Sequence, residues 1–178
     1  MVVLLDNPFV GIAIVLFLAF IDYPLTNIAR NLYRRYMSRY IEYEAVGKTG
    51  KIASRFFLFA TKIVIVLLLY LIWAIYHYGD VKIAGVCYLW LLGFAMGSYF
   101  IIDLRHVESL LLSRLYRQND LLSGKISYHA RLSLRISAVQ FFSIFLIFSG
   151  FLLIKPVYFT LGLACAPLFL VIRNLLIS

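Results

Sequence analysis

Five stretches of this chain are apolar and nearly free of charged side chains, and arginine and lysine gather between them. The stretches fall at about residues 7–29, 56–79, 83–102, 136–154 and 156–172. A helix of about 20 apolar residues can cross a hydrocarbon core of roughly 30 Å. The pattern therefore predicts an all-α, polytopic integral membrane protein in which residues 1–178 form a single membrane domain with about five transmembrane helices.

Two of these stretches contain one charged residue each. Lys62 lies near the start of the second stretch, where a long side chain can carry its ammonium group to the membrane interface. Asp22 interrupts the first stretch and is followed by Pro24, which removes a backbone donor and disfavours helix at the residue before it. We expect a kink or a restart of the helix there, so that the first span either crosses fully or is re-entrant.

The composition agrees with a membrane protein, since 63% of the 178 residues are hydrophobic and 14% are charged. An ordinary soluble domain is about 45–50% apolar and about 25% charged. Two cysteines in 178 residues exclude a disulfide scaffold, and Cys87 and Cys165 are expected to be free thiols inside spans. Small residues concentrate in the third and fifth stretches, which permits close helix approach; they include Gly93, Gly97 and Gly162.

The excess of positive charge, 17 Lys and Arg against 8 Asp and Glu, is arranged by topology. With five spans, only Lys82 and Lys155 fall on one side of the membrane, and the other basic residues fall in the linkers at 30–55 and 103–135, at Lys62 and after the last span. The positive-inside rule then places both linkers and the C-terminus in the cytoplasm and the N-terminus outside a plasma or inner membrane. Because topology accounts for the charge, no nucleic-acid partner is expected.

Both basic linkers have helical periodicity. Tyr33, Tyr36, Tyr40 and Tyr43 recur at spacings of 3, 4 and 3, which puts them on one helical face, and the third span is expected to continue as a helix to about Gln118. Such helices either lie on the headgroups of anionic lipids or pack together as a cytoplasmic bundle. The residues expected to contact headgroups are Arg30, Arg34, Arg35, Arg39, Tyr33, Tyr36, Tyr40, Arg114 and Arg117.

Short motifs recur in the same order along the two halves of the chain. An Asp near a span end is followed by Leu-Tyr-Arg and then by Gly-Lys-Ile, first at 22, 32–34 and 50–52, and again at 103, 115–117 and 124–126. This order indicates a parallel duplication of a two-helix unit, an arrangement found in some transporters. The alternative is that membrane boundaries recruit these residue types wherever they occur.

The polar residues at membrane depth are the candidate site, since ionisable groups there are costly and often functional. Asp22 either binds an ion or a proton or caps a restarted helix. Asp103, Arg105, His106 and Glu108 form the densest polar cluster, in which Asp103 and His106 share one helix face. A divalent cation could bind at Asp103 and His106 if further ligands converged there. The alternative is a boundary cluster with a local ion pair between Arg105 and Glu108.

These observations favour an oligomeric channel or transporter-like conduit for ions or small solutes, formed between protomers and lined by Asp22 and Asp103. A second hypothesis is an accessory or scaffold subunit of a larger membrane complex, which needs no site. A third is a cytoplasmic-face enzyme acting on a lipid headgroup, with arginines holding a phosphate and a metal at Asp103 and His106. Catalytic signatures such as a P-loop or H-E-x-x-H do not occur, so an enzyme is not favoured.

Overall fold

A computed structural model describes residues 2–38, 40–43, 51–118, 124, 126–128, 130–155 and 157–177. The described chain is almost entirely helical, and five of its helices are long and apolar enough to cross a membrane. Each of the five predicted stretches overlaps one of them. They are α2 (Pro8–Leu32), α3 (Lys51–Gly79), α4 (Lys82–Gln118), α5 (Ala130–Ile154) and α6 (Tyr158–Ile177), preceded by the short α1 (Val2–Asp6).

The first long helix, α2, is continuous. It begins at Pro8, where Asn7 accepts a hydrogen bond from the backbone N–H of Phe9 at 3.1 Å, and it passes through Pro24 to Leu32. Its 25 residues give a length of about 38 Å, more than the hydrocarbon thickness. The expected restart at Pro24 is wrong, because a proline removes a single donor and the buried face of α2 is held by its neighbours.

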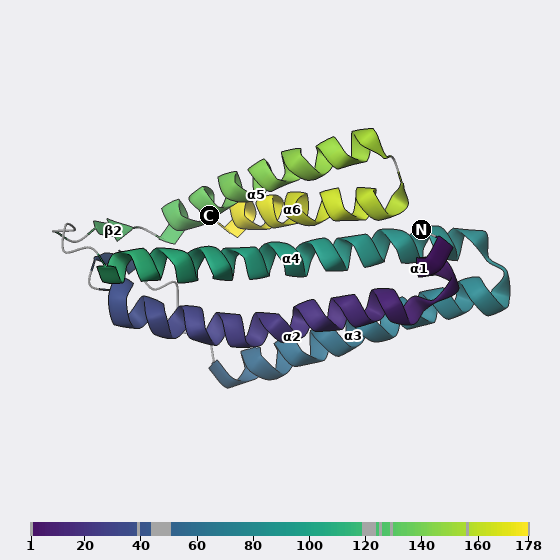
Figure 1. Cartoon of the computed structure of the whole chain (residues 1–178), viewed down its shortest axis with the longest axis horizontal. Helices are drawn as coiled ribbons and strands as arrows, with labels where there is room; N and C mark the ends of the chain where they lie inside the picture. Colours follow the sequence, from purple (N-terminus) through teal and green to yellow (C-terminus); the bar gives the residue numbers. More distant parts are fainter. Residues whose placement is uncertain are drawn as a thin grey trace.

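The longest helix, α4, lies in the middle of the bundle, with α2 and α3 on one side and α6 and α5 on the other (Figure 1). One buried cluster joins α2, α3 and α4, and includes Val15, Leu69, Tyr88 and Leu92. A second joins α4, α5 and α6, and includes Ile101, Phe141 and Ala166. Many large apolar side chains point outward instead, as expected for helices that face lipid.

Helices α4 and α6 approach so closely that their backbones touch at glycines. A Cβ atom on Gly162 would overlap the carbonyl oxygen of Trp90, and one on Gly93 would overlap the carbonyl oxygen of Phe159. A Cβ atom on Gly97 would lie 3.0 Å from that of Ala166. The small residues of the third and fifth apolar stretches therefore meet one another across this contact.

The two ends of the bundle differ in charge. The ends of α2 and α4, the starts of α3 and α5 and the C-terminus lie at the left end in Figure 1, while α1 and the turn between α3 and α4 lie at the right. The left end, called the basic end below, therefore includes the arginines that close α2 and α4 and follow the start of α5. Lys82 and Lys155 lie at the opposite end.

The linkers are only partly helical. The prediction that the third span continues to about Gln118 is confirmed, and at 37 residues α4 is about 55 Å long and extends beyond the hydrocarbon core. In the first linker, however, a π-helical turn, η1 (Tyr33–Met37), ends the helix, and strand β1 (Ile41–Tyr43) pairs in parallel with β2 (Ile126–Tyr128) from the second linker.

The tyrosines of the first linker therefore do not share one helical face, which corrects the prediction. At this helix end the Ser38 hydroxyl donates to the Arg34 carbonyl at 2.7 Å, and the Tyr33 hydroxyl donates to the carbonyl of Ile41 in β1 at 2.9 Å. The two copies of the Gly-Lys-Ile motif also differ in structure, since Lys51 begins α3 whereas Ile126 lies in β2. Arg39, Gly50 and Lys125 lie outside the described residues.

Candidate functional site

An ion-paired cluster joins three of the candidate membrane-spanning helices, α2, α3 and α4. The Asp22 carboxylate accepts from the Lys62 ammonium at 3.0 Å and from the Thr26 hydroxyl at 3.1 Å, and its other contact is His106 Nε2 at 3.4 Å. Lys62 also donates to the carbonyl of Ala19 at 2.7 Å. The side chains of Asp22 and Lys62 are only about a fifth exposed. The cluster therefore consists of mutually satisfied groups, as buried charges require.

This geometry bears on two expectations. Lys62 has a direct partner, because its ammonium faces a carboxylate on α2, and the expectation that it extends to the membrane interface stays a prediction. Asp22 does not cap a restarted helix, because α2 is continuous and the carboxylate binds side chains of three helices.

The register of α4 explains how the cluster forms. Tyr99, Asp103 and His106 are spaced by 4 and 3 and therefore lie on one face of α4. Lys62 Nζ lies 5.7 Å from the centre of the Tyr99 ring, and the Thr26 hydroxyl lies 2.9 Å from His106 Nε2. This face of α4 consequently meets both α2 and α3.

Asp103 lies against this cluster but has no hydrogen-bond partner among the described residues. Its side chain is buried, with 8% of the residue exposed, and neither carboxyl oxygen is accessible. The charges of Asp22 and Lys62 act on it. His106 is directed to Thr26 and Asp22, and within the described residues no group of three His, Cys, Asp or Glu side chains is arranged to hold a metal ion.

Arg105 and Glu108 turn to α5 instead of pairing with each other. Arg105 donates to the hydroxyl of Ser137 at 3.0 Å, and its guanidinium carbon lies 5.1 Å from the centre of the Phe141 ring. The Glu108 carboxylate accepts from the amide of Gln140 at 3.3 Å. Two polar bridges therefore connect α4 with α5 near the basic end.

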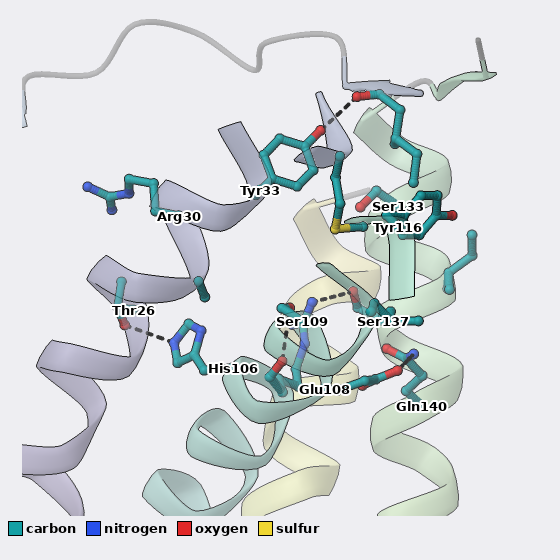
Figure 2. Close-up of a pocket in the computed structure, with 16 residues that line it drawn as sticks. Thr26, Arg30, Tyr33, His106, Glu108, Ser109, Tyr116, Ser133, Ser137 and Gln140 are labelled. Carbon is teal, nitrogen blue, oxygen red and sulfur yellow. Dashed lines mark hydrogen bonds between the residues drawn. The ribbon is translucent and has the colours of Figure 1, made fainter. Parts of the chain in front are cut away.

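A cavity of about 600 Å³ opens among α2, η1, α4 and α5 at this end (Figure 2). In Figure 2, Thr26 and His106 face each other on one side, Ser137 and Gln140 lie on the other, and the guanidinium of Arg30 points away from the rest. The polar lining residues are Thr26, Arg30, Tyr33, Arg105, His106, Glu108, Ser109, Tyr116, Ser133, Ser137 and Gln140. His106 thus contacts both the cavity and the ion-paired cluster.

The polar cavity is confined to one half of the bundle. Toward the opposite end, the space among α2, α3 and α4 is filled by the buried cluster that contains Val15, Leu69, Tyr88 and Leu92. The lining of the cavity therefore shares no residue with this apolar cluster.

The residues predicted to contact lipid headgroups lie in different places in the structure. Arg30 and Tyr33 line the cavity, whereas Tyr36, Arg114 and Arg117 line a second, mostly apolar cavity of about 390 Å³ between α2 and α4. The Tyr40 ring packs on that of Tyr116 with centres 5.8 Å apart. Arg34 and Arg35 are exposed.

Sequence reasoning missed several members of the site. The pairing of Lys62 with Asp22 was not predicted, and neither was the polar face of α5, although Ser133, Ser137 and Gln140 recur at spacings of 4 and 3. That spacing is a helical signal that was available in the sequence.

Comparison of the chain with protein-family models, curated proteins and solved structures finds no match. Its function is therefore argued from the site itself.

Proposed function

We propose that this chain is a membrane transport protein whose cavity takes an anionic solute from the basic end. The observation that carries the proposal is a cavity of about 600 Å³ within a single chain whose lining includes His106, which lies beside the Asp22–Lys62 ion pair. Ionisable groups at membrane depth commonly mark a solute or proton pathway. A route through one chain replaces the expectation of a conduit formed between protomers.

The lining favours an anion. Arg105 lines the cavity with its guanidinium directed at Ser137, Arg30 lines it with a guanidinium that points away from the other lining side chains (Figure 2), and Glu108 is the one acidic lining residue. A guanidinium group presents N–H donors in a planar fork that matches carboxylate and phosphate oxygens. Ser133 lies in the first turn of α5, where the helix dipole also attracts negative charge. Small-molecule sites commonly have volumes of about 300–1,000 Å³, so a small phosphate or carboxylate solute fits.

Because the cavity lies only at the basic end, it supports a transport mechanism in which the cavity is open to one side of the membrane at a time. The basic half is polar and hollow, while the opposite half is packed with apolar side chains. Helix α5 contacts α4 through Arg105–Ser137 and Glu108–Gln140, which are single hydrogen bonds that a moving helix could exchange. Alternating access by motion of one helix group against another is the usual mechanism for such an arrangement.

We also propose that the basic end is cytoplasmic and the N-terminus is outside, because positively charged linkers are retained inside. In a protein with Cys87 and Cys165 replaced by serine, Lys82→Cys is expected to react with an impermeant maleimide in intact cells. Arg34→Cys, exposed at the basic end, is expected to react only after permeabilisation. The reverse pattern would contradict this orientation.

Uptake by liposomes tests the transport proposal. Purified protein reconstituted into liposomes is expected to take up radiolabelled phosphate or a small dicarboxylate faster than protein-free liposomes do. Arg105→Gln should reduce this uptake at least about tenfold, because a lost charge-assisted hydrogen bond costs about 1.5–3 kcal/mol. Arg34→Gln is the matched control, since Arg34 is exposed at the same end and does not line the cavity; its uptake should match that of the wild type.

A failure of uptake would point to one of the other hypotheses. The Asp22–His106 pair beside the cavity has the composition of an oriented general base, so an enzyme acting on a lipid headgroup would release a headgroup product from the liposome lipids without moving free anions. A scaffold subunit would do neither. Loss of uptake in Arg34→Gln equal to that in Arg105→Gln would contradict a role for the cavity.

A further inference from the structure

Asp103 has a carboxyl group whose environment does not suit a negative charge. Only 8% of the residue is exposed, and both carboxyl oxygens are inaccessible and without a hydrogen-bond partner in the described part of the chain. An isolated ionised carboxylate in apolar surroundings is very costly and is avoided by pairing or by protonation. Asp22 on α2 shows the contrast, because it has the same charge but three polar side-chain contacts.

The charges around Asp103 are already balanced without it. Helix α2 supplies Asp22 and α3 supplies Lys62, and these two form an ion pair at 3.0 Å. On α4 itself, Tyr99 and His106 lie about one turn to either side, while Arg105 is directed to Ser137.

Helices α5 and α6, which lie on the other side of α4, add no compensating charge that is directed at Asp103. On α6 the cation near this end is Arg173, which is exposed and contacts Asn174. On α5, Arg131 and Arg135 are exposed.

We propose that Asp103 holds a proton in this conformation and exchanges it with the cavity through His106. The charge count explains the pairing of these two groups. With the proton on Asp103, His106 is neutral and the cluster carries no net charge. With the proton on the imidazole of His106, next to Asp22, Asp103 is an anion and the net charge is again zero. The transfer moves one proton between two groups on the same face of α4 and needs no other reactant.

A proton fits this place better than a metal ion does. Metal cations such as Ca²⁺ take about six to eight oxygen ligands, whereas the Asp103 oxygens are enclosed and Lys62 already places a positive charge nearby. A proton adds almost no volume and removes the negative charge directly.

His106 is suited to connect Asp103 with water in the cavity. It lies three residues after Asp103 on α4, it lines the cavity, and its Nε2 lies 2.9 Å from Thr26 and 3.4 Å from Asp22. Imidazole takes up and releases protons near neutral pH, so it can pass a proton to cavity water. The role of this proton in coupling rests on the proposed transport function, while its binding does not.

Dicyclohexylcarbodiimide and infrared spectroscopy test the proposal on the purified full-length protein. This apolar carbodiimide reacts with protonated carboxyl groups in apolar surroundings, and peptide mass spectrometry locates the adduct. We expect modification of Asp103 that decreases as the pH rises, together with an infrared carbonyl band of a protonated carboxyl that is missing in Asp103→Asn. Asp6→Asn, which changes an exposed acid, should leave both signals intact.

His106→Gln separates a proton relay from a structural role. Without the imidazole, the Asp103 proton loses its path to cavity water, so after transfer to D₂O the shift of its carbonyl band should proceed at least about tenfold more slowly than in the wild type, as tenfold in rate corresponds to 1.36 kcal/mol. Exchange at the wild-type rate would overturn the relay.

One outcome would overturn proton binding itself. It is a wild-type infrared spectrum that Asp103→Asn leaves unchanged. Because asparagine is nearly isosteric with a protonated aspartic acid, Asp103→Asn is expected to fold, and the pH dependence of the wild-type carbonyl band decides the question if it does not. If the carbonyl band of Asp103 is present but liposomes take up no anion, the transport proposal is contradicted and the proton site is not. If liposomes take up the anion but the band is missing, the proton site is contradicted and the transport proposal is not.

Discussion

Replacing Lys62 with methionine is expected to lower the free energy of unfolding by about 3 kcal/mol, the lower end of the range for breaking a buried ion pair. The change removes the ammonium that lies 3.0 Å from the Asp22 carboxylate and 2.7 Å from the Ala19 carbonyl. The carboxylate would then remain at membrane depth with only the Thr26 hydroxyl and His106 as partners. Unfolding in mixed detergent micelles, followed by tryptophan fluorescence, measures the loss.

A double-mutant cycle identifies the pair as the cause. Asp22→Asn in the Lys62→Met background removes the stranded charge and should restore part of the lost free energy, giving a coupling energy of at least about 1 kcal/mol. Lys82→Met is the matched control, because Lys82 is exposed at the opposite end, and it should change stability by less than about 0.5 kcal/mol. Equal stability of Lys62→Met and the wild type would contradict the ion pair.

The spans were predictable because they depend on local composition. A run of apolar residues requires a helix in lipid, since each backbone polar group must be satisfied within the segment. The continuation of α4 to Gln118 could be inferred from the helical spacing of its apolar residues. The path after Met37 could not, because Tyr36 and Tyr40 have helical spacing while the chain there is directed by β1 pairing with β2, which is far away in sequence.

The site was predictable residue by residue but not as an arrangement. Asp22, Asp103 and His106 could be identified because charge is rare at membrane depth. Their partners could not, because periodicity shows which face of a helix is polar but not which helix it meets. The alternative of a local pair between Arg105 and Glu108 is replaced by contacts to α5, and Lys62 contacts Asp22 on α2.

Replacing Gly162 with alanine is expected to separate α6 from α4 and to cost about 3 kcal/mol or more, the upper end of the range for overpacking. The added methyl group would overlap the carbonyl oxygen of Trp90 and lie 2.8 Å from the backbone nitrogen of Phe94. Because these are backbone atoms, no side-chain rotation can relieve the overlap, and a whole helix must move. Gly93→Ala should have a comparable effect through the carbonyl of Phe159. Unfolding in mixed micelles measures both.

Gly150→Ala is the control for these two variants, because a Cβ atom there would meet nothing within 4 Å and the residue lies inside α5. Alanine favours helix over glycine by about 1 kcal/mol, so this variant should be as stable as the wild type or more stable. The contrast isolates the close contact from helix propensity, since propensity alone would stabilise all three variants. If Gly162→Ala and Gly93→Ala were also stabilising, the helices could not approach as closely as the structure describes.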